Sequence, residues 1–295
     1  MFRVRRLLAP FVLCIALLFS EAQAFTIAWL SDTQNYHNAY KPIFDGMTQW
    51  IADNRAALDI RFVFHTGDVV GSWRSEDQWR QARESMDILS SASIPFLAAC
   101  GNHDIGYRMN YANFLKYVLS LRPASMSQEY GDTGSRYELF SANGRDYIFM
   151  GIAFSNKGPS EDEVNWINGV LRQYSSRDAI IITHSYLKKS ASYTTQGKAI
   201  FEKIVKANPN VFLVLCGHCR DISYKNVQLD DDGDGDPDRT VYAILSNFQG
   251  SKAGGGGYMR ILDFRDSDIY IYTYSPYYDS CEYPKGKTEA TVPLP

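Results

Sequence analysis

The stretch PFLAACGNHD, residues 95–104, sets an apolar run directly before a group of residues that carry chemistry. The run has the composition of a buried strand, and Asn102, His103 and Asp104 follow it at once. Gly101 gives the backbone the freedom to turn sharply out of the strand. Amide oxygens, imidazoles and carboxylates bind divalent transition metals. The stretch therefore predicts a metal site where a strand ends, which is where open α/β sheets place their ligands.

Four other segments repeat this arrangement along the chain. Each follows a run that is predicted to be a buried strand, over residues 26–30, 62–65, 179–182 and 211–215. The polar segments are Asp32-Thr33-Gln34, Gly67-Asp68, Thr183-His184 and Gly217-His218. We expect their side chains to converge on a divalent ion that lowers the pKa of water. Asp68 has two carboxylate oxygens and is the expected bridge between two ions.

Apolar runs alternate with helical patterns through the first two thirds of the chain. Apolar spacing predicts helices over residues 42–57, 76–91, 111–121, 161–174 and 197–207. Ser160 and Glu163 fit a capping box at the start of the fourth helix. Asn143-Gly144 marks a hairpin between strands over residues 136–140 and 147–154.

The last third of the chain is rich in strands. They are predicted over residues 222–229, 240–245, 258–264 and 268–274. Residues 254–257 and the Gly/Pro/Lys-rich tail are expected to be loops. Taken together, the pattern predicts an α/β protein with two packed sheets and helices on the outside.

Residues 1–24 have the pattern of a secretory signal peptide. Three arginines precede an apolar stretch over residues 7–19, and Ala22-Gln23-Ala24 offers a small-x-small cleavage site. The stretch is too short to span a bilayer comfortably. We therefore expect an exported protein, periplasmic or extracellular, without stable membrane insertion once the signal is removed.

Composition narrows the class of protein and its partners. The formal net charge is −3 and the hydrophobic content is 45%, as in a globular protein with a real core. The sequence has no long basic run, so nucleic acid is not expected as a partner. Four cysteines follow the leader: Cys100, Cys216, Cys219 and Cys281. An exported protein can oxidise them, and the sequence leaves all three pairings open.

In order and spacing, the polar segments resemble those of the calcineurin-like metallophosphoesterases. The family pattern is D-x-[HQ], G-D-x-x-[DN], G-N-H-[DE], a lone His after a strand, and G-H-x-H, and it is matched from Asp32 to about Arg220. Asp32-Thr33-Gln34 and Thr273-Tyr274-Ser275-Pro276 resemble a secreted branch of the family. The resemblance implies one domain over residues 25–295, a four-layer α/β/β/α sandwich of two mixed sheets flanked by helices.

The resemblance also implies an activity, a metal centre and a phosphorylated substrate. The activity would be metal-dependent hydrolysis of a phosphate ester by a phosphomonoesterase, phosphodiesterase or phosphoprotein phosphatase. Two ions, of Mn, Fe or Zn, would be held: the first by Asp32, Gln34 and Asp68, the second by Asp68, Asn102, His184 and His218. His103 would not bind metal, and would act as general acid for the leaving group or as a charged clamp on the phosphate.

Three positions depart from the family pattern. Gln34 replaces the commoner His, Arg220 stands at the last His of G-H-x-H, and Gly71 stands where an acidic partner of the catalytic His is usual. A guanidinium offers no lone pair to a metal, so a single ion is an alternative to two. Arg220 is expected to hold a phosphate oxygen by a bidentate contact. Asp104 is the candidate replacement partner for His103.

These departures leave a second function open. A degenerate member of the family would keep the fold, with at most one ion, and would bind a phosphorylated ligand without cleaving it. A third function comes from Cys216-Gly217-His218-Cys219, which has the C-x-x-C form of thiol–disulfide oxidoreductases. That motif normally opens a helix, whereas residues 221–229 have a strand pattern, so a structural pair between Cys216 and Cys219 is favoured over thiol exchange.

Two further features have less specific patterns. Residues 230–238 resemble a calcium loop with Asp230 at its first position, but Val241 stands at position 12, where a bidentate Glu belongs. An acidic, solvated hairpin turn is favoured there over a calcium site. Tyr36 and His37 directly follow the first ligand segment and are candidate substrate contacts.

Overall fold

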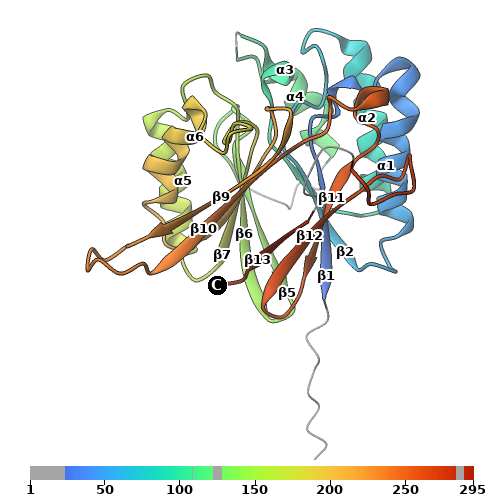
Figure 1. The fold of residues 1–295 in the computed structure, drawn as a ribbon. Helices are drawn as coiled ribbons and strands as arrows, with labels where there is room; N and C mark the ends of the chain where they lie inside the picture. Colours follow the sequence, from blue (N-terminus) through green and yellow to red (C-terminus); the bar gives the residue numbers. More distant parts are fainter. Residues whose placement is uncertain (1–23, 108, 122–127, 284–288) are drawn as a thin grey trace, which may run out of the picture.

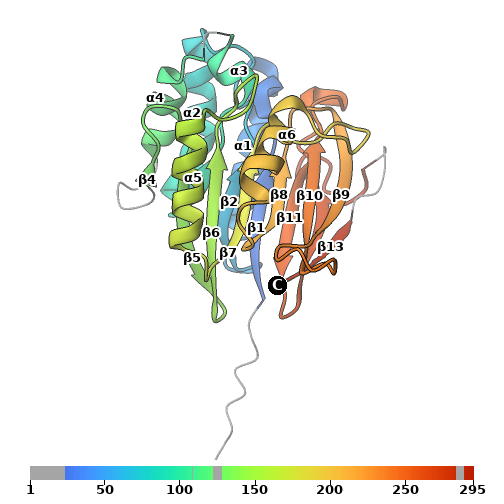
Figure 2. The same ribbon diagram turned by 90° about the vertical axis from the view of Figure 1, so that its left-hand side faces the viewer.

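The computed structural model describes residues 24–107, 109–121, 128–283 and 289–295. The predicted signal peptide lies outside the described residues except for Ala24, and its assignment stays a prediction. The described residues form two mixed sheets packed face to face, with helices on the outer face of each (Figures 1 and 2). The expected α/β/β/α sandwich is confirmed.

The first sheet has six strands within the described residues, in the order β13-β12-β11-β1-β2-β3. Strands β1, β2 and β3 are parallel, and β11 to β13 extend the sheet on the other side of β1 by antiparallel pairing. The bounds are β1 Phe25–Leu30, β2 Ile60–His65, β3 Phe96–Ala98, β11 Met259–Phe264, β12 Asp268–Tyr274 and β13 Ala290–Pro293.

The second sheet has seven strands within the described ranges, in the order β4-β5-β6-β7-β8-β10-β9. Strands β6, β7, β8 and β10 are parallel, so their carboxyl ends share one edge of the sheet. The bounds are β4 Gln128–Glu129, β5 Arg136–Ala142, β6 Arg145–Ile152, β7 Asp178–Thr183, β8 Val211–Cys216, β9 Asp221–Leu229 and β10 Arg239–Asn247.

Helices α1 and α2 cover the first sheet, and α5 and α6 cover the second (Figures 1 and 2). Their bounds are α1 Lys41–Asp53, α2 Glu76–Ser91, α3 Asn102–Ile105, α4 Ala112–Tyr117, α5 Glu161–Gln173 and α6 Thr195–Ile200. None of the helices in the described part of the chain combines the length and apolar composition that crossing a membrane requires.

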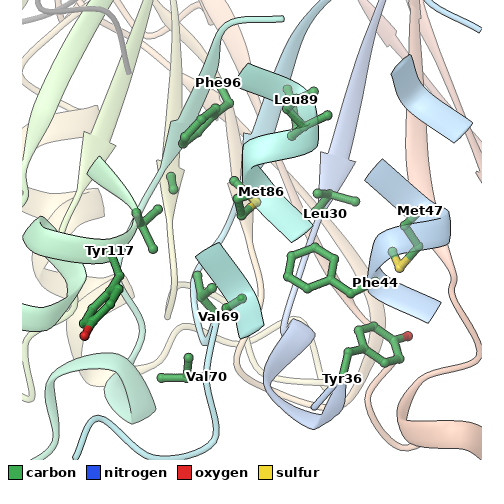
Figure 3. Packing of buried hydrophobic residues seen from close by; sticks show 14 of the residues in the cluster. Leu30, Tyr36, Phe44, Met47, Val69, Val70, Met86, Leu89, Phe96 and Tyr117 are labelled. Atoms are coloured by element: carbon green, nitrogen blue, oxygen red, sulfur yellow. The ribbon is translucent and has the colours of Figure 1, made fainter. Parts of the chain in front are cut away.

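Apolar side chains fill three interfaces of the sandwich. In Figure 3, Phe44 and Met47 of α1 and Met86 of α2 lie over Leu30 at the end of β1, and all four are buried. Burying one such side chain stabilises the fold by roughly 1.5–3 kcal/mol. Aromatic rings fill the space between the sheets, where the Phe64 and Phe149 centroids lie 4.8 Å apart, edge to face. This packing holds the strand ends of the two sheets in a fixed relation.

The structure corrects several local predictions. The fifth helix ends its α-helical part at Ile200 and continues as a π-helix over Phe201–Val205. The tail, which was expected to be a loop, contributes strand β13, because its residues pair with the edge of β12. The capping box forms only in part: Ser160 Oγ accepts from Glu163 N, but the Glu163 carboxylate instead accepts from Ser135 Oγ at 2.5 Å.

Candidate active site

The polar segments all follow the carboxyl ends of parallel strands. Asp32 lies two residues beyond β1, Asp68 three beyond β2, and Asn102 four beyond β3, while His184 and His218 follow β7 and β8. The two sheets contact each other at this edge. The backbone N–H of His218, after β8 of the second sheet, donates to both carboxylate oxygens of Asp32, after β1 of the first sheet, at 3.2 Å. Topology therefore brings together side chains that are as far apart in sequence as 186 residues.

His184 lies at the centre of the cluster. Its Nε2 is 3.3 Å from Asp68 Oδ2, 3.1 Å from Asn102 Oδ1 and 3.2 Å from His218 Nδ1. Donor atoms of Asp68, His184 and His218 all lie within 4.8 Å of one another. Two imidazoles, a carboxylate and an amide oxygen around one point form a donor set that suits a divalent transition metal.

Asp32 and Gln34 lie beside this cluster. The Asp32 carboxylate accepts from Ser31 Oγ at 2.5 Å, and burial raises the Asp32 pKa to about 7. The Oε1 atom of Gln34 is buried and has no hydrogen-bond partner among the described residues. An unpaired buried oxygen costs about 1–3 kcal/mol, so an oxygen left in this state fits a ligand for a cation.

Three of the candidate ligands have strained backbones. Asp32, Asp68 and His218 have φ values of 51°, 53° and 69°, in the left-handed region that L-residues rarely adopt. Such strain persists only where the surroundings enforce it, and it is concentrated at functional sites. Here the strained residues follow the strand ends: the side chains of Asp68 and His218 belong to the cluster around His184, and the Asp32 carboxylate accepts the His218 backbone N–H.

The charges in the cluster depend on one another. Burial alone would lower the His184 pKa, but the carboxylates of Asp68 and Asp32 raise it to about 9. Burial raises the Asp68 pKa, and the stronger effect of His184 and the His103 N–H brings it below its usual value. Burial lowers the His218 pKa to about 4. An ion bound here would take the place of the His184 proton, since metal ligands must be deprotonated.

His103 is exposed at the rim, and its partner is a backbone atom. Its Nδ1 lies 2.8 Å from the carbonyl oxygen of Gly71, which can only accept, so Nδ1 carries a proton and Nε2 is left for substrate. The expected pairing with Asp104 is wrong. The Asp104 carboxylate accepts backbone N–H groups of Val69, Val70 and Gly101 at 2.7–3.0 Å, and so joins the loops after β2 and β3.

His65, a residue that sequence reasoning missed, supports the site by contacting two of the ligand segments. His65 ends β2, is fully buried, and contacts Thr33 Oγ1 through Nε2 at 3.0 Å. Its Nδ1 accepts from Gly67 N at 3.1 Å. Burial lowers the His65 pKa to about 3, so the ring stays neutral and joins the first two ligand segments. Its only sequence signal was a polar residue at the end of an apolar run.

The structure also locates Tyr36, His37 and Arg220, for which the sequence predicted contacts with the substrate. Tyr36 is buried, and its hydroxyl accepts from Gly257 N at 2.9 Å, so it is a packing residue and not a substrate contact. His37 is half-buried, with its Nδ1 3.0 Å from Asn38 Nδ2. Arg220 is exposed in the turn after His218, beside a pocket, and not within the ligand cluster.

The four cysteines in the described part of the chain are free thiols, so the expected Cys216–Cys219 pair does not form. Cys216 is buried at the end of β8, and burial raises its pKa to about 12. A buried thiol with a raised pKa is a poor nucleophile, whereas exchange chemistry needs an accessible thiolate. The C-x-x-C motif is therefore structural, and its glycine and histidine belong to the metal-site edge.

The acidic loop forms the expected hairpin turn, between β9 and β10. Asp230, Asp232 and Asp238 are exposed, and their carboxylates are close enough to share an ion. These carboxylates accept hydrogen bonds from backbone N–H groups: those of Gly233 and Gly235 donate to Asp230 at 2.6 and 2.8 Å. These bonds account for the turn without a cation.

The chain is similar to known proteins in family, in sequence and in structure. A family model described as calcineurin-like phosphoesterase matches residues 25–219. A curated relative, the uncharacterized protein YvnB of Bacillus subtilis (strain 168), is 41% identical over 259 residues, which cover 86% of this chain. The match covers 20% of YvnB, so this chain spans about a fifth of the length of that relative.

Solved structures share the fold at low sequence identity. A dimetal phosphatase from Danio rerio has a TM-score of 0.61 at 12% identity, with 91% of this chain and 98% of that chain covered. The purple acid phosphatase PPD1 of yellow lupin, Lupinus luteus, has a TM-score of 0.59 at 13% identity, with 92% of this chain and 55% of that chain covered. GAP50 of Plasmodium, described as the anchor in the inner membrane complex, has a TM-score of 0.59 at 14% identity. The match covers 92% of this chain and 89% of that chain.

Proposed function

The chain belongs to the calcineurin-like phosphoesterase family, and from this membership we propose that the cluster around His184 is a two-ion centre at which phosphate esters are hydrolysed. The finer activity is a phosphomonoesterase, phosphodiesterase or phosphoprotein phosphatase. The observation that carries the proposal is the convergence of Asp68, Asn102 and His218 on His184, each within 3.3 Å of its Nε2.

The residues present fit divalent ions. Asp32, Gln34 and Asp68 would hold one ion, and Asp68, Asn102, His184 and His218 the other. The unpaired Gln34 oxygen supports the first set, and the mixed oxygen and imidazole donors suit Mn, Fe or Zn. When bound, such ions acidify water and neutralise phosphate oxygens. Arg220 supplies no donor, so the first ion would have fewer protein ligands than the second.

His103 is placed to deliver a proton to the leaving group. It is exposed at the rim, and its Nδ1 donates to the Gly71 carbonyl, which leaves Nε2 for a substrate. To act as an acid, the ring must carry protons on both nitrogens. The Asp68 carboxylate accepts the His103 backbone N–H at 2.9 Å, which ties the position of this proton donor to the metal ligands.

The role of His103 predicts a dependence on the leaving group. His103→Ala should lower kcat/KM about 10²- to 10⁴-fold for glycerol 3-phosphate, whose alkoxide needs a proton. The loss should be much smaller for 4-nitrophenyl phosphate, whose phenolate leaves without one. Metal content should stay at the wild-type level. An equal loss for both substrates would instead make His103 a clamp on the phosphate.

The proposed function is tested by removing and restoring metal. Protein dialysed against a chelator should lose hydrolysis of 4-nitrophenyl phosphate and should recover it with Mn²⁺, and elemental analysis should find up to two ions per chain. Ion binding without turnover of any phosphate ester would favour the degenerate binding protein. The substitution of Arg220 for a ligand histidine is the observation that favours this second candidate.

We also propose that the protein acts outside the cytoplasm. The support is the sequence of its first 24 residues, with arginines, an apolar stretch and a small-x-small site. Measuring the N-terminal residue of the protein from its native host tests the proposal, with Phe25 as the expected first residue.

A further inference from the structure

A pocket of about 250 Å³ opens beside the turn that carries His218. Its lining residues come from the segments after β7, β8 and β10, from the ends of β9 and β10, and from the chain after β12 of the first sheet. The lining consists of Lys189, Arg220, Asp221, Asn247, Gly250 and Tyr283. We call it the Arg220 pocket.

Asn247 joins the Arg220 pocket to the ligand cluster. It ends β10, which is parallel to β8, so it reaches the edge where His218 follows β8. Its Nδ2 donates to the His218 carbonyl at 3.0 Å, and its Oδ1 accepts from Gln249 N at 2.9 Å. Asn247 also pairs with Asp221 across the β9–β10 ladder, so this one residue connects the pocket lining with the His218 turn.

Among the residues that the structure describes, one cation of the pocket has no partner. Lys189 Nζ lies 2.5 Å from Asp221 Oδ2, so these two charges offset each other. The Arg220 guanidinium is exposed and makes no hydrogen bond or ion pair with the residues that the structure describes. Tyr283 forms a fixed wall, since its buried ring packs on Phe248 with the centroids 5.0 Å apart.

We propose that the Arg220 pocket binds a second oxyanion of the substrate, a phosphate or a carboxylate, while the scissile phosphate lies on the ligand cluster. The inference rests on the proposed function and specifies its substrate class. A guanidinium binds either oxyanion with two parallel hydrogen bonds, which a lone ammonium cannot do. Arg220, two residues beyond His218, stands where the family pattern has a metal-binding histidine. In this chain the residue would determine substrate specificity and would not bind a metal.

The test uses two pairs of substrates that differ only by the second oxyanion. Fructose 1,6-bisphosphate is compared with fructose 6-phosphate, and 3-phosphoglycerate with glycerol 3-phosphate, by phosphate release from Mn²⁺-loaded protein. Wild-type kcat/KM should favour the doubly anionic member of at least one pair by about 10- to 100-fold. The pair that shows the preference identifies the oxyanion as phosphate or carboxylate.

Arg220→Gln should abolish this preference, and Arg220→Lys should restore only part of it. The matched control is Arg265→Gln, which removes an exposed guanidinium paired with Asp263 at the opposite edge of the sandwich and should keep the preference. Calorimetric titration of His103→Ala protein with both fructose phosphates measures the same discrimination as a ratio of Kd values, without turnover.

Two results would overturn the inference while leaving the proposed function intact. One is a wild-type enzyme that turns over both members of each pair equally. The other is an Arg220→Gln variant that loses activity equally on both members, which would place Arg220 on the scissile phosphate. A wild-type protein that binds Mn²⁺ but hydrolyses no phosphate ester would refute the proposed function, and the inference with it.

Discussion

Asp68→Asn is expected to lower kcat/KM by about 10³-fold or more and to remove bound metal, while the protein stays folded. Asp68 is buried, and its side chain contacts His184 Nε2 at 3.3 Å and His103 N at 2.9 Å. Ion catalysis supplies several kcal/mol of transition-state stabilisation, and each 1.36 kcal/mol is a factor of ten in rate. The amide oxygen of Asn can still accept the His103 N–H, and Asn tolerates the left-handed φ of 53°.

The effect is measured as kcat/KM with saturating Mn²⁺ and as metal content by elemental analysis, with circular dichroism to check the fold. Asp263→Asn is the matched control. It removes a carboxylate paired with Arg265 near the amino end of β1, far along the strand from the metal site, and should leave activity unchanged. Full activity in Asp68→Asn protein would contradict the proposed centre.

Gly101→Ala is expected to disrupt the site by steric contact alone. A Cβ at Gly101 would lie 2.2 Å from Asp68 Oδ1 and 2.3 Å from Asp68 N, closer than atoms can approach. The Gly101 φ of −101° suits any residue, so backbone strain plays no part. Relieving the contact must move Asp68 or the loop after β3. We expect the free energy of unfolding to fall by about 1–3 kcal/mol and activity to fall at least as sharply as for Asp68→Asn.

The control is a second glycine-to-alanine change in open space. Gly169 is exposed within α5, and among the described residues nothing would lie within 4 Å of a Cβ there. Gly169→Ala should raise stability by up to about 1 kcal/mol, because Ala favours helix over Gly, and should not change kcat/KM. Urea unfolding measures both variants. A stable, active Gly101→Ala protein would show that Asp68 need not hold its observed position.

Much of the fold was predictable because its signals are local. Helix α2 begins where Ser75 Oγ accepts from Gln78 N at 3.3 Å, and helix α5 where Ser160 accepts from Glu163 N. The strands were visible as apolar runs, because a strand buried on both faces has no polar alternation. Strand β13 was missed because its four residues form a strand only by pairing with β12.

The candidate site was predictable as a set of residues, but not as a set of contacts. The partner of His103 is the carbonyl oxygen of Gly71. Every residue has a backbone carbonyl, so the sequence does not indicate which one accepts this hydrogen bond. Asp104 was misassigned for a related reason: its partners are three backbone N–H groups that meet only when two loops meet. The supporting role of His65 depends in the same way on Thr33 and Gly67.

By itself, the sequence determined which metal-binding side chains stand at strand ends, because strand burial and turn chemistry are encoded within a few neighbouring residues. Only the tertiary structure decided that Asp32 of one sheet meets His218 of the other, and that Arg220 faces a pocket instead of an ion. Those relations depend on how two sheets pack across an aromatic core, which is settled by contacts between residues far apart in the chain.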